Sequence, residues 1–111
     1  MAARKRALEA ELEEARRRVG VELNAGLADL ETARLSVNVE AGGVQQATAT
    51  LTVEQERHLA GRATTNDLLE AEAQLRNRQT AFNLAKLDVV RAWVRLWLAA
   101  GRLTPEDLAS M

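Results

Sequence analysis

The residues of this sequence that could carry chemistry are few, and most of them fall between Glu54 and Glu70. His58 is the only histidine, and Glu54 and Glu56 are spaced like solvated helix residues. With no cysteine or second histidine, no metal site is expected. Asp67 and Glu70 stand one helical turn apart, so their carboxylates share one face. No nucleophile sits in a sharp turn and no glycine-rich phosphate loop occurs, so we expect neither catalysis nor a cofactor.

Asp67 also has a structural role, because Thr64 and Asp67 have the spacing of a helix capping box. The Thr64 hydroxyl is expected to accept a hydrogen bond from the Asp67 amide, and the Asp67 carboxylate to accept one from the Thr64 amide. An anion in the first turn also suits the positive end of the helix dipole. A helix is therefore predicted to begin at about residue 65.

Gly61 is predicted to end the preceding helix. Glycine takes the left-handed backbone conformation that closes many helices without a steric penalty. Arg57 lies in the last turn before it, where a cation suits the carbonyl end of a helix. Residues 60–64 are therefore expected to form the tip of a hairpin.

Before the tip, apolar or small residues recur in steps of three and four, with an average close to the helical period. This row contains Leu8, Leu12, Ala15, Val19, Leu23, Gly26, Leu30, Ala33, Val37, Ala41, Val44, Thr48 and Leu51. The row predicts one helix over about 3–59, which is on the order of 80 Å long. A break at Gly42-Gly43 would give a three-helix bundle, but the row stays in phase across both glycines and no Asn, Asp, Ser or Pro flanks them. Close approach of another backbone, or a bend, better explains glycines in a continuous helix.

After the tip, a second helix is predicted over about 65–100. Its row contains Leu68, Glu72, Leu75, Gln79, Phe82, Ala85, Val89, Trp93, Leu96 and Ala100. A second apolar row lies beside it and contains Leu84, Leu87, Val90, Val94, Trp97 and Leu98. A helix that is apolar on so many sides must contact more than one neighbour. Thr104-Pro105 then predicts a short helix over about 105–110.

The composition agrees with an all-α fold. Of 111 residues, 47% are hydrophobic and 28% charged, with one proline and three aromatic residues, which is typical of long helices. The formal net charge is −1, and the charges are interspersed, so no nucleic-acid or anionic-membrane surface is expected. Trp93 and Trp97 lack a basic groove and are expected to pack between helices rather than to stack on bases. No run approaches the roughly 20 apolar residues of a membrane span.

A fold at Gly61 would place side by side those residues whose numbers sum to about 122. Trp93 would then lie near Leu30, and the first twenty residues would extend past the second helix. The second apolar row would remain exposed on a lone hairpin, so we expect an obligate oligomer or a portion of a larger helical assembly. A monodisperse monomer in analytical ultracentrifugation would contradict this.

The stretch from Arg57 to Ala71, Arg-His-Leu-Ala-Gly-Arg-Ala-Thr-Thr-Asn-Asp-Leu-Leu-Glu-Ala, resembles the periplasmic tip of the TolC-like outer-membrane efflux proteins. Trp97-Leu98-Ala99-Ala100-Gly101 and Thr104-Pro105-Glu106-Asp107-Leu108 are similar to the end of that family's second repeat. The likeness is specific at these two places and generic from Met1 to Glu54.

The resemblance implies a passive export channel in which three protomers, each with two helical repeats, form an α-barrel across the periplasm. The tip residues Gly61, Arg62, Ala63 and Thr64 would dock a periplasmic adaptor protein, which links the channel to an inner-membrane pump. Asp67 and Glu70 would place carboxylate rings at the pore entrance, where like charges repel each other and attract cations. The implied location is the outer membrane, with this portion in the periplasm.

Two departures from that family matter. His58 stands where the family usually has an aromatic residue. The sequence also holds one repeat and no β-strands, so we expect it to be a C-terminal portion that meets the membrane only through strands absent from it. Two alternatives stay open: the α-hairpin of a periplasmic adaptor, whose tip has similar glycine, hydroxyl and acid spacing, and a generic coiled-coil scaffold that pairs hairpins without a ring.

Overall fold

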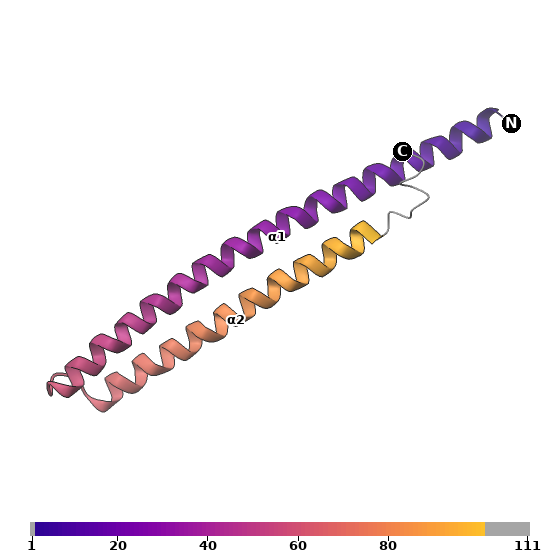
Figure 1. Cartoon of the computed structure of the whole chain (residues 1–111). Coiled ribbons are helices and arrows are strands. Elements are labelled where there is room, and N and C mark those ends of the chain that lie inside the picture. Colours follow the sequence, from indigo (N-terminus) through magenta and orange to yellow (C-terminus); the bar gives the residue numbers. More distant parts are fainter. Residues whose placement is uncertain (1, 102–111) are drawn as a thin grey trace. The chain divides into compact units, whose positions relative to one another are not determined.

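The computed structural model describes residues 2–101, which form two long helices and no strand (Figure 1). Helix α1 spans Ala2–Leu59 and helix α2 spans Thr65–Gly101. The predicted all-α class is confirmed. The short helix predicted at about 105–110 lies outside the described residues.

Helix α1 continues through Gly42 and Gly43, where the alternative fold would have broken it. The described residues divide into two compact units. One comprises residues 2–31 and 90–101, and the other comprises Thr32–Val89. We refer to them as the terminal unit and the tip unit and describe each by itself.

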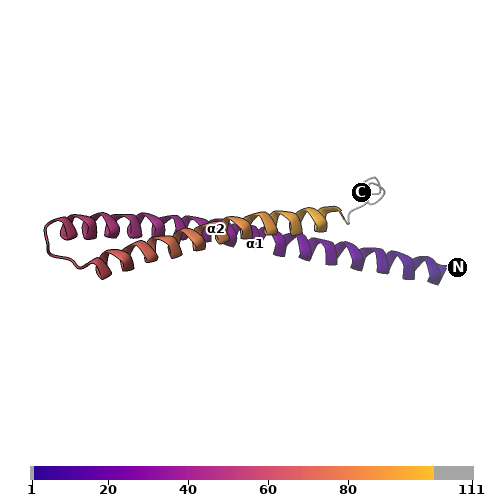
Figure 2. The ribbon, with the colours of Figure 1, turned by 90° about the horizontal axis from the view of Figure 1, so that it is seen from below.

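In the tip unit, the α1 and α2 stretches run antiparallel on either side of the turn (Figures 1 and 2). Their contact, which we call the seam, follows residues that alternate in steps of three and four, the heptad pattern of a coiled coil. The α1 side of the seam contains Ala33, Val37, Glu40, Val44, Ala47, Leu51, Glu54 and His58, and the α2 side contains Leu68, Ala71, Leu75, Phe82, Ala85 and Val89. The most buried of these are Ala47, Ala71 and Ala85. Alanine at the centre of the seam lets the two backbones approach closely.

The terminal unit repeats this arrangement over a shorter length. Leu30 and Ala92 are its buried residues. A Cβ added at Gly26 would lie 3.8 Å from the Leu96 Cα and 3.2 Å from its Cδ1, so the two helices are close at this point. Gly26 and Leu96 satisfy the predicted sum of 122, and the prediction that a helical glycine marks a close approach is confirmed here. Residues 2–18 are exposed.

The predicted rows were wrong at four positions. Thr48, Gln79, Trp93 and Ala100 were placed in the seam and are exposed. In each case the seam passes through the preceding residue. Alanine precedes three of these four residues. At Trp93 the reason is steric, because Ala92 fits between close backbones, whereas a tryptophan would hold the helices apart. Trp93 is therefore turned to the side, with 43% of its surface exposed.

Arg78, which precedes Gln79, is the one residue of these four that is not an alanine. It lies at a seam position but is exposed. A Cβ added at Gly43 would lie 3.5 Å from the Arg78 Cδ. That distance is an ordinary van der Waals contact, so the arginine stem packs over Gly43 while its charge reaches solvent.

Candidate functional site at the hairpin tip

Helix α1 ends in a Schellman motif centred on Gly61. Gly61 has a φ of +72°, the left-handed conformation predicted for it. Its N–H donates to the His58 carbonyl at 3.0 Å, and the Arg62 N–H donates to the Arg57 carbonyl at 2.7 Å. These two bonds satisfy carbonyls that the helix end would otherwise leave unpaired. The chain is thereby reversed in a defined geometry.

Helix α2 begins with the predicted capping box. The Thr64 N–H donates to Asp67 Oδ2 at 3.0 Å, and the Asp67 N–H donates to Thr64 Oγ1 at 3.2 Å. The Leu68 N–H then donates to the Thr64 carbonyl at 3.2 Å, which starts the helical hydrogen-bond series. Both side-chain bonds were predicted from the sequence and are confirmed.

Two side chains of α1, His58 and Arg57, form hydrogen bonds with backbone carbonyls of the turn. Nδ1 of the half-buried His58 lies 3.1 Å from the Ala63 carbonyl, so this nitrogen carries a proton and donates it. Arg57 Nη2 donates to the Arg62 carbonyl at 3.5 Å. His58 thus has a structural role at this turn. The sequence carried no signal for this bond, which joins a side chain to a backbone carbonyl five residues away across a turn.

A charged hollow of about 300 Å³ opens beside the tip. It is lined by Thr50, Glu54 and Arg57 from α1 and by Asp67, Glu70, Ala71 and Gln74 from α2. Arg57 Nη1 forms an ion pair with Glu54 Oε1 at 3.1 Å. The hollow therefore holds three carboxylates around one guanidinium. Asp67 and Glu70 line the same hollow, as expected, and Arg57 lies beside them. The position of Arg57 next to these two carboxylates was not predicted, although the spacing of Glu54 and Arg57 suits a helical ion pair.

The capping box perturbs the ionisation of the Asp67 carboxyl. The hydrogen bond from the Thr64 N–H lowers the pKa of Asp67 below its usual value of 3.8, and the Thr64 side chain and the Arg57 charge act in the same direction. Slight desolvation opposes them. Asp67 is therefore anionic at neutral pH, when it also completes the cap.

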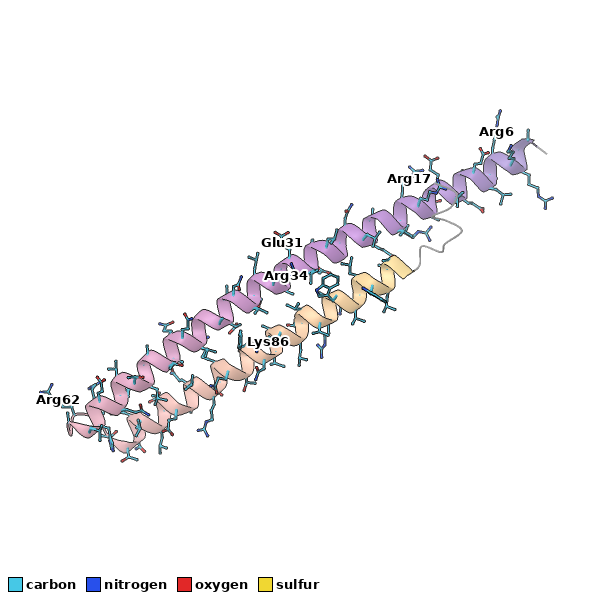
Figure 3. All side chains as sticks on the ribbon, viewed as in Figure 1. Arg6, Arg17, Glu31, Arg34, Arg62 and Lys86 are labelled. Atoms are coloured by element: carbon cyan, nitrogen blue, oxygen red, sulfur yellow. The ribbon has the colours of Figure 1, made fainter. Side chains whose placement is uncertain are left out.

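The predicted docking residues lie at the tip, mostly in solvent. Gly61, Arg62 and Thr64 are exposed, and Ala63 is half-buried. Figure 3 shows the Arg62 side chain projecting outward from the turn. In the hydrogen bonds described above, Arg62 takes part through its N–H and its carbonyl and not through its guanidinium.

Among residues 2–101, no group of three or more His, Cys, Asp or Glu side chains is placed to hold a metal ion. Within the same range, neither helix combines the length and apolar character that crossing a membrane requires.

Comparison of this chain with protein-family models, with curated proteins and with solved structures found no match.

Proposed function

We propose that this chain is a helical hairpin of a passive outer-membrane export channel of the TolC-like type. In this proposal several hairpins stand side by side in a trimeric α-barrel within the periplasm. The tip meets a periplasmic adaptor that is coupled to an inner-membrane pump. The proposal draws on the resemblance of Arg57–Ala71 to such tips and on the exposed apolar surface of the helices.

The observation that carries the proposal is an inversion of the usual burial pattern. Among the described residues, the buried side chains are one leucine and four alanines, whereas sixteen Leu, Val and Trp side chains are exposed. Exposed apolar surface of this extent marks an interaction surface. In this proposal, the exposed apolar side chains contact neighbouring hairpins.

In the tip unit, exposed residues of α1 form a second heptad row that is mostly apolar or small, which we call the outer row. It contains Leu35, Val39, Gly42, Gln46, Ala49 and Val53, all exposed. By the helical period this row lies on the side of α1 away from the seam. A helix with two such rows contacts one neighbour through the seam and a second neighbour through the outer row. If every hairpin makes both contacts, the helices form a layer that can close into a barrel.

The tip carboxylates suit the entrance of such a channel. Asp67 and Glu70 are exposed and face one hollow. Repeated around an axis, they would form rings of negative charge that attract cations. Arg57 partly offsets this charge, so the Asp67→Asn/Glu70→Gln variant is the direct test. Planar-bilayer recordings of the channel that contains this chain should show weaker block by divalent cations, and unchanged block and conductance would remove the gate assignment.

The assembly itself is tested by negative-stain electron microscopy and native mass spectrometry of the purified chain. A ring of parallel hairpins supports the channel. Discrete pairs of hairpins, without a ring, would instead favour a coiled-coil scaffold and contradict the proposal.

A further inference from the structure

A second hollow lies in the tip unit, away from the turn. It has a volume of about 370 Å³ and is lined by Arg34, Val37 and Asn38 of α1 and by Lys86 and Val89 of α2. We call it the basic groove. Figure 3 shows Arg34 on α1 and Lys86 on the adjacent stretch of α2.

The groove has an apolar floor and a polar rim. Val37 and Val89 are half-buried seam residues, whereas Arg34, Asn38 and Lys86 are exposed. The floor provides a surface for an apolar side chain, and the rim provides hydrogen-bond donors on both helices.

The two cations are not explained by the packing of the hairpin itself. Arg34 and Lys86 flank the seam on facing helices, where opposite charges would be favourable and like charges are unfavourable. No acidic residue lines the groove. The Lys86 ammonium lies 4.2 Å from the centre of the Phe82 ring, which helps to hold this charge in place. The groove therefore presents two positive charges whose counter-charge it does not itself contain.

We propose that the basic groove docks an acidic amphipathic helix of a partner protein. Apolar residues of that helix would rest on Val37 and Val89, and its carboxylates would face Arg34 and Lys86. An open groove between two helices suits a third helix, which presents residues at spacings of three and four. Small molecules instead favour sites that enclose most of their surface. This inference does not depend on the export-channel proposal.

The test uses two synthetic amphipathic peptides of about 21 residues, equivalent to about 30 Å of helix. Both have the same apolar row, flanked by glutamate in one peptide and by lysine in the other. Fluorescence anisotropy against the full chain should show binding of the glutamate peptide and at least about tenfold weaker binding of the lysine peptide. Raising the salt from about 50 to about 500 mM should weaken binding of the glutamate peptide.

The variant Arg34→Gln/Lys86→Gln should lower the affinity for the glutamate peptide about tenfold, as expected for the loss of two rim charge pairs. Both side chains are exposed, so the helical circular dichroism should not change. Arg76→Gln is the matched control, because Arg76 is an exposed cation of the same unit that does not line the groove. It should leave the affinity unchanged.

Three results would overturn the proposal. They are no binding of the glutamate peptide up to about 1 mM, an equal loss of affinity with Arg76→Gln, or no effect of the double variant. Binding to phosphatidylglycerol-containing vesicles that depends on Arg34 and Lys86, without binding of the glutamate peptide, would assign the groove to lipid headgroups and also reject the proposal.

Discussion

Gly61 and Gly42 show how one residue type serves two purposes in this chain. An added Cβ would meet nothing within 4 Å at either position. Gly61, however, has a φ of +72°, whereas Gly42 lies within helix α1. Any effect of a methyl group on the hairpin's own stability must therefore come from the backbone conformation and not from a clash.

Gly61→Ala should lower the free energy of unfolding by about 1–2 kcal/mol, because the left-handed conformation penalises a Cβ. Gly42→Ala should raise it by about 1 kcal/mol, because alanine favours the helix. Urea denaturation followed by far-ultraviolet circular dichroism measures both changes. A Gly61→Ala variant at least as stable as the unsubstituted chain would show that the turn does not require a positive φ.

Asp67 should make the stability of the hairpin depend on pH. Its pKa is lower in the folded chain than its usual value of 3.8, so its contribution is present above 3.8 and is lost as the pH falls through the lower folded value. Asp67→Asn should therefore lower the melting temperature near neutral pH, and the difference from the unsubstituted chain should shrink below pH 3.8. Glu70→Gln is the control, since Glu70 is exposed one turn further on and should leave the melting temperature nearly unchanged. A difference for Asp67→Asn that persists at low pH would show that the carboxylate charge is not what stabilises the cap.

At the tip, the features that could be predicted from the sequence are those that depend on neighbouring residues in the chain. The Gly61 conformation and the two capping hydrogen bonds follow from residue types within four positions of each other. The His58 bond to the Ala63 carbonyl could not be predicted, because it depends on the path of the turn in space. The position of Arg57 among the tip carboxylates depends likewise on how the two helices face each other.

At the scale of the helices, the seam is defined by its alanines. Ala85 is 4% exposed and Ala71 is 6% exposed, so the two backbones leave little room for larger side chains there. Replacing one of these alanines with leucine should force the helices apart or push a side chain out of its preferred rotamer.

Ala85→Leu should therefore destabilise the hairpin by about 1–3 kcal/mol. Ala49→Leu provides the comparison, because Ala49 is an exposed residue of the outer row and its substitution should change stability by less than about 0.5 kcal/mol. Thermal unfolding of the two variants under identical conditions measures the difference. Equal stabilities would mean that the seam is looser than its burial indicates.

The existence of two long helices was predictable from the sequence because the apolar spacing persists through Gly42 and Gly43. The phase of the seam was less predictable. If large apolar residues are assumed to fill the seam, Trp93 is the predicted seam residue. The helices approach too closely for a tryptophan, and Ala92, which is 7% exposed, occupies the seam instead. The seam at this point therefore lies one residue before its predicted position. This shift depends on the distance between the two helices, which the sequence of one helix does not reveal.

At the scale of the whole molecule, both units expose large apolar side chains. In the tip unit these include Leu35, Leu84 and Leu87, and in the terminal unit Trp97 and Leu98. The most buried seam residues of this chain are alanines, and sixteen of its larger apolar side chains are exposed, which is the pattern on which the barrel proposal rests.

Trp97 provides the sharpest test of the barrel proposal, because 76% of its surface is exposed and it borders an apolar hollow with Trp93, Val94 and Leu98. Within a monomer, Trp97→Ser should change stability by less than about 0.5 kcal/mol. If Trp97 anchors a contact between chains, the same substitution should weaken association by about 2 kcal/mol, or roughly 30-fold. Sedimentation velocity over a range of concentrations separates the two cases, with Arg62→Ser at the exposed tip as a control that leaves self-association unchanged. A purified chain that stays monomeric at every concentration would show that the outward apolar surface is not used for self-assembly, and the barrel proposal would fail with it.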